Sequence, residues 1–417
     1  MHHVARPDPP TRSPREAAER RLVLVIGAVV FVDTMFYAVI APLLPGLAHD
    51  LRLSKLSAGL LTASYAIGVL LGSLPGGVLA VRAGPRFTVC TGLTLLACST
   101  IAFGLLHEAA ALDAARFVEG VGGACSWAGG LAWIVSETPA ARRGAMIGRA
   151  IGAAIGGALF GPVIGTVASA VGRPLLFCGL AIVAVLLITM TRGLPAHHAS
   201  SEQGLRNLLN ALGKPRVAAG MWLVALPAIA SGLISVLGPL RLHRLGAGAT
   251  VIGATFLAAA ALEAAITPAI GSLSDRRGRL VPLRYGLAAT GTALLCFTTP
   301  NSAALLAGVI VGTAAGLGFF WAPAMAMLSD AAEAHGLEQG LAAALMNLAW
   351  ASGQIIGSGG GGAVAKAAGD AVPMAAGAGL CAATLAALAR APIMKARMAS
   401  LSARTAREAG DQGKRVR

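Results

Sequence analysis

The stretch Gly148–Thr166, GRAIGAAIGGALFGPVIGT, carries six glycines in nineteen residues and a proline at position 162. In a water-soluble helix each interior glycine costs about 1 kcal/mol relative to alanine, and an interior proline costs about 3 kcal/mol. In lipid the helix forms regardless, because unpaired backbone polar groups are far more costly there. Glycines spaced four apart also leave flat stripes on which a second helix can lie closely. The stretch therefore predicts a membrane helix that packs tightly and can bend at Gly161-Pro162.

The composition of the whole chain agrees with this interpretation. Of its 417 residues, 56% are hydrophobic and 12% are charged, and the mean hydropathy is +0.73. Soluble proteins carry about 25% charged residues. The net charge of +15 could indicate nucleic-acid binding, but that function needs a concentrated basic face. Here the basic residues lie in short loops and tails, so we expect an integral membrane protein that binds no nucleic acid.

Apolar segments of about 20 residues, the length needed to span a bilayer, recur twelve times. The predicted spans are residues 22–47, 56–80, 87–107, 111–135, 145–170, 174–192, 216–240, 250–273, 281–299, 303–329, 338–365 and 371–391. They predict an all-α membrane protein with one six-helix bundle in residues 22–193 and another in residues 216–392. Residues 1–21 are predicted to be a disordered arm, residues 194–215 a cytoplasmic linker and residues 393–417 a basic tail.

The distribution of Lys and Arg predicts the orientation. With both termini in the cytoplasm, the cytoplasmic segments hold 26 of these residues and the external loops hold 6, as the positive-inside rule requires. We therefore expect a multi-pass protein of the cell inner membrane with both termini cytoplasmic. The basic tail is expected to contact anionic lipid, and the protein is expected to be a monomer.

An internal repeat relates the two halves. Residues 77–86, GVLAVRAGPR, align without gaps on residues 271–280, GSLSDRRGRL, at an offset of 194 residues, close to half of the chain. Two six-helix halves in the same orientation are the parallel-repeat plan of one class of secondary transporter.

Twelve spans in two halves with this loop in both resemble the major facilitator superfamily, whose loop pattern is roughly G-x-L-x-D-R-x-G-R-R/K. The residues that carry the match are Gly77, Arg82, Gly84 and Arg86 in the first copy and Gly271, Asp275, Arg276, Gly278 and Arg279 in the second. In the family the loop aspartate helps to hold the halves together on the cytoplasmic side. Val81 stands at that position in the first copy, so the resemblance leaves Asp275 as the residue for an equivalent contact.

The opening stretch resembles one branch of that family. Gly148, Gly157, Gly161-Pro162 and Gly165 reproduce the spacing of the fifth-helix signature of drug–proton antiporters, with Thr166 in place of the final glycine. Residues 33–45, DTMFYAVIAPLLP, are similar to the first helix of tetracycline exporters and vesicular amine transporters. The resemblance covers residues 22–392. It implies proton-driven export and gives the glycine stretch a conformational role.

Asp33 is the first candidate for the chemistry, because an ionisable side chain inside a membrane costs at least about 2.5–3.5 kcal/mol. It lies about twelve residues into its span, or about 18 Å of helix rise, near the middle of the bilayer. Tyr37 shares its helix face one turn later, and Phe36 lies nearby. An acid among aromatic rings suits a lipophilic cation, through charge pairing and cation–π attraction. The alternative is a structural acid that is hydrogen-bonded to a neighbour.

Three further ionisable residues are predicted inside spans. Arg116 and Glu119 lie three apart, so they can pair on one helix face. The pair is either structural or part of proton coupling, and the resemblance favours coupling for Arg116, which stands in the family's R-F-x-x-G context. Glu263 has no basic residue in its own helix before Arg276. Such a carboxyl is either a proton carrier or a hydrogen-bonded structural acid.

Other polar and aromatic residues are weaker candidates for lining a substrate cavity. These residues are Trp127, Phe320, Trp321, Asn347, Trp350 and Gln354. No enzyme motif and no Walker loop is present, so ATP-driven transport is disfavoured. The six cysteines lie in apolar runs without a CxxC pair, so we expect buried thiols rather than disulfides or a metal site.

Together these features predict a proton-coupled exporter of small lipophilic compounds, cationic ones included, such as drugs or antibiotics. It would use no cofactor beyond the proton gradient. The main alternative is a facilitator or importer of a metabolite such as a sugar or an organic anion, although alanine- and glycine-rich spans fit sugars poorly. A membrane scaffold or sensor is the third possibility, and buried acids would have no purpose in it.

Overall fold

The computed structural model describes residues 14–195, 210–337 and 339–390. Most of the predicted arm and linker and all of the predicted tail lie outside these residues. The described helices of the first half are α1 (Pro14–Ala38), α2 (Ile40–Asp50), α3 (Lys55–Arg82), α4 (Pro85–Leu105), α5 (Ala109–Glu137), α6 (Ala140–Val171) and α7 (Arg173–Thr191). Residues 14–21 are helical, so the prediction of a disordered arm up to residue 21 was wrong for this part. Pro14 can occupy the first turn because the missing N–H has no partner there.

The second half repeats the same helical plan. Its elements are α9 (Pro215–Arg244), α10 (Ala249–Arg277), α11 (Leu280–Cys296), α12 (Ala303–Glu333), α13 (Gln339–Ile355), the π-helix η1 (Ile356–Gly360), α14 (Gly361–Ala368) and the helix Ala371–Arg390. Two groups of labels each describe a single rod. The helices α1 and α2 are interrupted only at Val39, and α13 runs through η1 into α14. The described residues thus form the twelve predicted spans. Apart from the start of the first helix, each end lies within a few residues of the predicted one.

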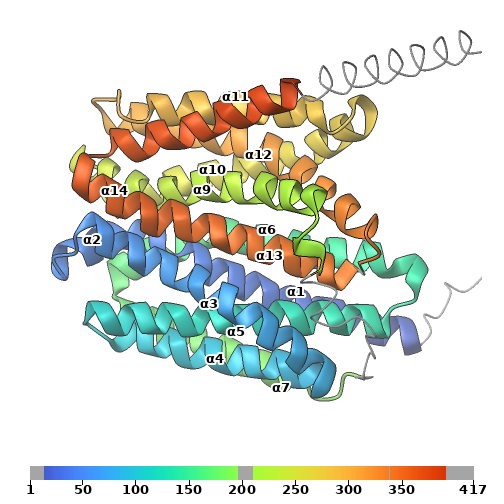
Figure 1. Cartoon of the computed structure of the whole chain (residues 1–417). Coiled ribbons are helices and arrows are strands. Elements are labelled where there is room, and N and C mark those ends of the chain that lie inside the picture. Colours follow the sequence, from blue (N-terminus) through green and yellow to red (C-terminus); the bar gives the residue numbers. More distant parts are fainter. Residues whose placement is uncertain (1–13, 196–209, 338, 391–417) are drawn as a thin grey trace, which may run out of the picture.

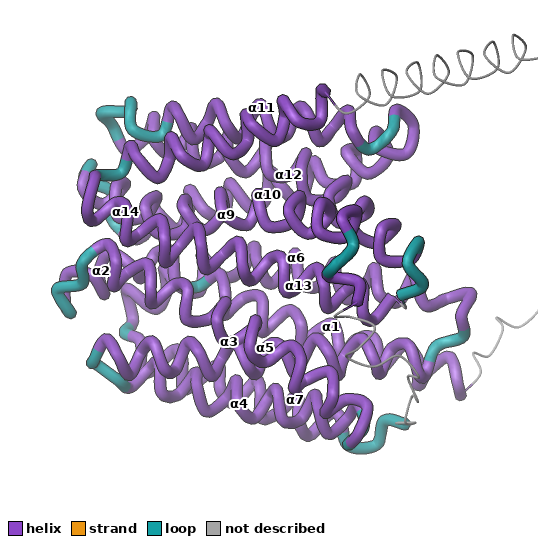
Figure 2. The backbone as a smooth tube through the Cα atoms, in the orientation of Figure 1, coloured by secondary structure: helices purple, strands orange, loops and turns teal. Residues whose placement is uncertain are grey.

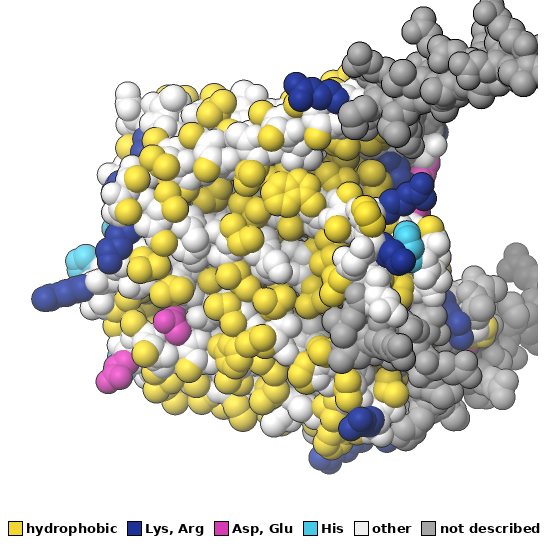
Figure 3. Space-filling view, viewed as in Figure 1, with side chains coloured by type: hydrophobic (Ala, Val, Ile, Leu, Met, Phe, Trp, Pro, Cys, Tyr) yellow, Lys and Arg dark blue, Asp and Glu magenta, His cyan; other side chains and the backbone are white. Residues whose placement is uncertain are grey.

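Helices run across the whole molecule and loops lie at its two ends (Figure 2). Nine of the described helices are long and apolar enough to cross a membrane. Among the remaining rods, α11 is shorter, α5 contains charged residues, and α13–α14 is divided by its π-turn. Apolar side chains cover the middle of the visible face, whereas Lys and Arg gather toward the ends (Figure 3). This is the surface of a multi-pass membrane protein.

Helices from the first half gather on one side of the molecule and helices from the second half on the other (Figure 1). The halves meet where α3 packs on α13, η1 and α14, and where α6 packs on α10. The hydrophobic core is continuous across this boundary, since one buried cluster contains residues such as Val29 and Leu44 together with Leu233 and Met374.

The glycine stripe of the opening stretch is the surface on which α6 lies against α1. A Cβ atom added to Gly157 would lie 2.2 Å from the carbonyl oxygen of Phe31, and one on Gly165 would lie 2.3 Å from that of Val39. At Gly161 it would lie 2.4 Å from the Ala38 Cβ. Only glycine fits such contacts, so this stripe fixes the position of the helix that carries Asp33. The helix α6 is continuous through Pro162, and its conformational role stays a prediction.

Alanine substitutions along this stripe are expected to differ sharply in their effect on stability. Gly161→Ala overpacks the α1–α6 contact and should lower stability by about 1–3 kcal/mol. Gly148→Ala is the matched control, because its added Cβ would meet no atom within 4 Å, and alanine favours the helix by up to about 1 kcal/mol. Thermal unfolding of the purified variants measures both effects. Equal melting temperatures for the two variants would contradict the packing assignment.

The repeated loops have matching geometry. Gly84 has φ +88° and Gly278 has φ +83°, and the two positions are 194 residues apart, the offset of the repeat. Each adopts the left-handed backbone that favours glycine. Gly77 and Gly271 face open space, with no atom within 4 Å of an added Cβ.

The charged loop residues contact only their own half. Arg86 donates to the carbonyl of Leu194, and Arg279 donates to Ala326 O at 2.8 Å and pairs with Asp330. The Asp330 side chain stays 60% exposed in this pair. Arg82, Asp275 and Arg276 are exposed. Asp275 makes no hydrogen bond or ion pair with the described residues, so the expected contact between the halves is not seen there.

Candidate functional site

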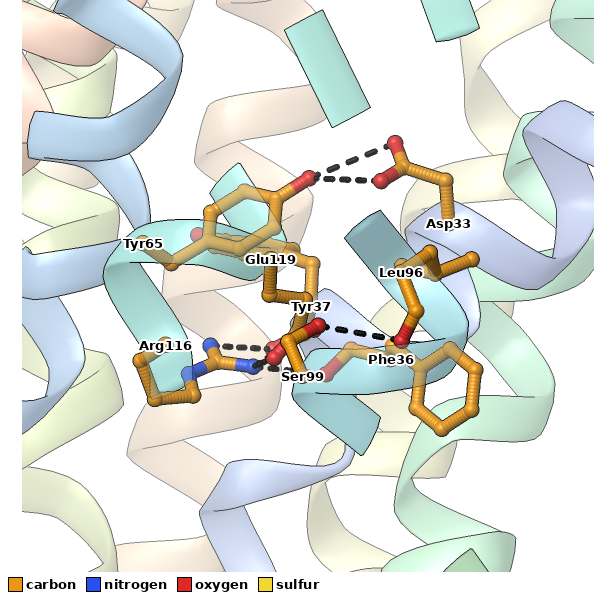
Figure 4. Close-up of polar contacts among 8 residues, drawn as sticks. All are labelled: Asp33, Phe36, Tyr37, Tyr65, Leu96, Ser99, Arg116 and Glu119. Carbon is orange, nitrogen blue, oxygen red and sulfur yellow. Dashed lines mark hydrogen bonds and ion pairs between the residues drawn. The ribbon is translucent and has the colours of Figure 1, made fainter. Parts of the chain in front are cut away.

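Asp33 is buried in the first half and is held by two hydrogen-bond donors. Its side chain is 1% exposed. Tyr65 Oη on α3 donates to Oδ1 at 3.1 Å and to Oδ2 at 3.3 Å, and Trp127 Nε1 on α5 donates to Oδ2 at 3.0 Å. Figure 4 shows the Tyr65 hydroxyl pointing at the carboxylate. The sequence placed Asp33 mid-membrane, and the tertiary structure supplies the two donors that satisfy it.

Glycines on α3 and α5 bring these donors into place. A Cβ atom on Gly68 would lie 2.1 Å from Phe117 O, and one on Gly120 would lie 2.0 Å from Tyr65 O, so the two backbones touch. On Gly123 it would lie 2.4 Å from Asp33 Oδ1. A side chain at any of these positions would separate the helices or displace the carboxylate.

Arg116 and Glu119 form a buried ion pair on α5. Arg116 Nη1 lies 2.9 Å from Glu119 Oε1 and 3.0 Å from Oε2, and the two side chains are 1% and 4% exposed. The guanidinium also donates to the carbonyls of Phe36 at 3.0 Å and Tyr37 at 3.4 Å, near the end of α1. The predicted pairing is confirmed in the structure, and the pair is tied to the helix that carries Asp33.

Tyr65 links the ion pair to Asp33. The Arg116 Cζ lies 5.0 Å from the centre of the Tyr65 ring, in the range of a cation–π contact. The hydroxyl of the same ring bonds Asp33, so the aspartate, the tyrosine and the ion pair form one contiguous group (Figure 4).

Tyr37 connects this group with residues of the second half. Its ring centre lies 5.1 Å from that of Tyr65 and 5.3 Å from that of Trp350 on α13. Gln354 Nε2, also on α13, donates to the Tyr37 hydroxyl at 2.5 Å and to Ser231 Oγ on α9 at 3.4 Å. Trp350 and Gln354 therefore meet Tyr37 where the halves face each other, in the centre of the protein.

The other predicted residues are placed less directly. Glu263 is partly buried on α10, and its carboxylate has no hydrogen-bond partner among the described residues. Asn347 is likewise partly buried without a described polar partner. Trp321 packs on two apolar clusters, one that spans both halves and one within the second half, and Phe320 is fully buried.

The Phe36 side chain packs toward α7. The residue is 1% exposed and its ring stacks on Phe177 of α7, with ring centres 6.1 Å apart. Residues three apart lie only about 60° from each other around a helix, so it is the packing on Phe177, and not the helical spacing, that separates the Phe36 ring from the group around Asp33. Only the backbone carbonyl of Phe36 contacts the site, through Arg116.

Sequence reasoning missed Tyr65, Ser231 and the glycine at position 123. Tyr65 could have been noticed, because it is one of only three tyrosines in the chain and lies mid-span. Nothing in the sequence distinguishes Ser231 from the other serines, and Gly123 is one of 54 glycines. Within the described residues no group of three or more His, Cys, Asp or Glu could hold a metal ion, and the six cysteines are unpaired.

Comparison with known proteins agrees with the fold. The model of the Major Facilitator Superfamily matches residues 26–312 and 221–410. The chain resembles the solved structure of a bacterial homolog of the human lysosomal transporter Spinster, inward-facing and unoccupied, with a TM-score of 0.71 and 16% identity over 91% of this chain and 97% of that one. It also resembles the xylose transporter XylE from E. coli in a partially occluded inward-open conformation, with a TM-score of 0.70 and 14% identity over 88% and 96% of the two chains. At these identities the likeness shows the fold alone.

Two curated relatives match over part of the chain. The chain is 32% identical over 140 residues to a probable vesicular acetylcholine transporter-B from Danio rerio. The aligned segment covers 31% of this chain and 28% of the relative. It is 27% identical over 126 residues to the quinolone resistance protein NorA from Staphylococcus aureus. This segment covers 30% of this chain and 32% of the relative. The matched segments thus span about a third of the length of these relatives. The family model covers most of the chain, and the chain belongs to the Major Facilitator Superfamily of transporters.

Proposed function

We propose that this transporter exports small lipophilic compounds, cationic ones among them, in exchange for protons. The observation that carries the proposal is the buried carboxylate of Asp33, which lies among Tyr65, Trp127 and the Arg116–Glu119 pair. Burying an ionisable side chain at this depth in a membrane costs free energy, so its presence indicates a functional role. The partial similarity to a quinolone resistance protein and to a probable vesicular acetylcholine transporter supports export of drug-like and cationic compounds.

Competition for one carboxylate would couple the two fluxes. Ionised Asp33 accepts hydrogen bonds from Tyr65 and Trp127 and would attract an organic cation, with the rings of Tyr37 and Trp350 adding cation–π attraction. Once protonated, the carboxyl loses its charge and one acceptor position, so the cation is released. Glu263 on α10, in the second half, would be a second proton carrier.

Alternating access would complete the cycle, as the two halves rock about the central group and expose it to each side in turn. The driving force is sufficient. A proton motive force of about 150 mV is worth about 3.4 kcal/mol per charge, which sustains a gradient of a few hundred-fold. By the Lys and Arg distribution, we place the protein in the cell inner membrane with both termini in the cytoplasm.

Flux in proteoliposomes tests the function. The reconstituted protein is supplied with a fluorescent lipophilic cation, with and without an imposed pH gradient. Proton antiport predicts uphill movement of the cation against the proton flux, and none without the gradient. Equilibration that ignores the gradient would instead indicate a facilitator, and movement in the same direction as protons would indicate an importer. Absence of flux for cations, sugars and organic anions alike would refute transport of these classes.

A further inference from the structure

Three charged side chains from both halves meet at the end of the molecule where α2 turns into α3. Lys55 Nζ at the start of α3 lies 2.5 Å from Asp370 Oδ1, and Arg244 at the end of α9 pairs with Asp370 Oδ2. Asp370 lies between α14 and the helix Ala371–Arg390, and its side chain is 5% exposed. Lys55 belongs to the first half, whereas Arg244 and Asp370 belong to the second.

The backbones beside this cluster are in direct contact. A Cβ atom on Gly362 of α14 would lie 2.5 Å from Lys55 O, and one on Gly59 of α3 would lie 2.4 Å from Ser358 O of η1. Lys55 Nζ also reaches Ala365 O at 3.5 Å. The two halves are therefore closed against each other at this end, and the ion pair lies at the margin of the closed contact.

The opposite end has a different pattern of charges. Among the described residues, the ion pair Arg279–Asp330 joins two residues of the second half, and the pair Arg142–Glu19 joins two residues of the first. Within the described part of the chain, Lys55–Asp370 is the ion pair that crosses between the halves. The charged connection is thus confined to the end that the Lys and Arg distribution predicts to be external.

We propose that Lys55 and Asp370 form a latch that keeps this end of the transporter closed, and that outward opening requires the latch to break. This rests on the alternating access of the proposed function. Arg244 makes such a latch reversible. It lies in the same half as Asp370, so the aspartate keeps a partner when the halves separate, and opening does not leave an unpaired buried charge.

Acidity on this side has a defined effect on the latch. Burial raises the pKa of Asp370, but the hydrogen bonds and charges of Lys55 and Arg244 outweigh it and set the pKa below its ordinary value. On opening, Asp370 keeps Arg244 but loses Lys55, so its pKa rises from the depressed closed-state value toward the ordinary value of about 3.9. The latch therefore stabilises closure above this range and loses the effect as pH falls through it. The latch should therefore persist from pH 7 down to about 5.

Hydrogen exchange of the full chain in lipid nanodiscs, without substrate or pH gradient, tests the latch. Asp370→Asn should raise amide exchange in residues 55–59 and 361–369 by about tenfold, since closure loses an ion pair at a nearly buried position. It should also lower exchange around Gly84 and Gly278, because opening one end closes the other. Asp370→Glu, which keeps the charge, should restore much of the wild-type pattern.

A second variant opens the same end without altering charge. Gly362→Ala inserts a Cβ against Lys55 O and should give the same reciprocal pattern, whereas Gly360→Ala meets no atom within 4 Å and should not. Unchanged exchange in both Asp370→Asn and Gly362→Ala, or a rise at both ends, would overturn the latch. Because no substrate is present, this result is independent of whether the protein exports lipophilic cations.

Discussion

Asp33→Asn is expected to abolish proton-driven export, reducing a gradient of about a few hundred-fold to none, while the protein stays folded and inserted. Asparagine has nearly the same shape as aspartate and can still accept a hydrogen bond from Tyr65 or Trp127. It cannot ionise, so it can neither carry a proton nor attract a cation by charge. The loss of one of the observed hydrogen bonds should cost only about 1–3 kcal/mol of stability. Uphill flux in proteoliposomes is the measurement.

A matched substitution separates this effect from a general loss of acidic residues. Asp113→Asn changes a half-buried acid on α5 that has no hydrogen-bond partner among the described residues, and it should leave uphill flux near the wild-type level. Binding offers a second readout. Asp33→Asn should weaken the binding of a lipophilic cation more than the binding of an uncharged compound of similar size. Uphill export by Asp33→Asn at the wild-type rate would exclude Asp33 as the coupling residue.

Arg116→Met is expected to have the largest effect on stability. It would leave Glu119, whose side chain is 4% exposed, without its partner, and breaking a buried ion pair in this way costs about 3–5 kcal/mol. That is a large part of the total stability of about 5–15 kcal/mol that folded proteins have. We expect a much lower yield of folded protein and a lower melting temperature, measured by thermal unfolding in detergent.

The double variant Arg116→Met/Glu119→Met should recover most of this loss, because no unpaired charge remains. Arg142→Met is the control. It breaks the pair with Glu19, in which the arginine is 45% exposed, and such pairs contribute about 0–1 kcal/mol. If Arg116→Met proved as stable as Arg142→Met, the buried pair would have no structural importance. Flux in the double variant then reports its role: recovery of folding without uphill transport assigns the pair to coupling.

The residues of the site were predictable to different degrees. Asp33, Arg116 and Glu119 are visible in the sequence because a charge within an apolar span is rare and costly. The helical period further places Arg116 and Glu119 on one face, and the structure joins them. The surroundings of Phe36 were not predictable in this way, because its ring packs on Phe177, a residue of another helix.

The sequence by itself determined the class of protein, the twelve spans and the repeat of the two loops. These properties are local: hydropathy sums over a window of about 20 residues, and a left-handed glycine is marked by its own position in the loop. The contacts that make the site were decided only by the tertiary structure. Tyr65 with Asp33, Gln354 with Tyr37 and Lys55 with Asp370 join residues 32, 317 and 315 apart in the chain. Such pairings depend on how each helix is rotated and how closely it approaches its neighbour. In this protein the closest approaches are set by glycines, and the sequence pattern distinguished those of α6 but not Gly68, Gly120 and Gly123 beside the site.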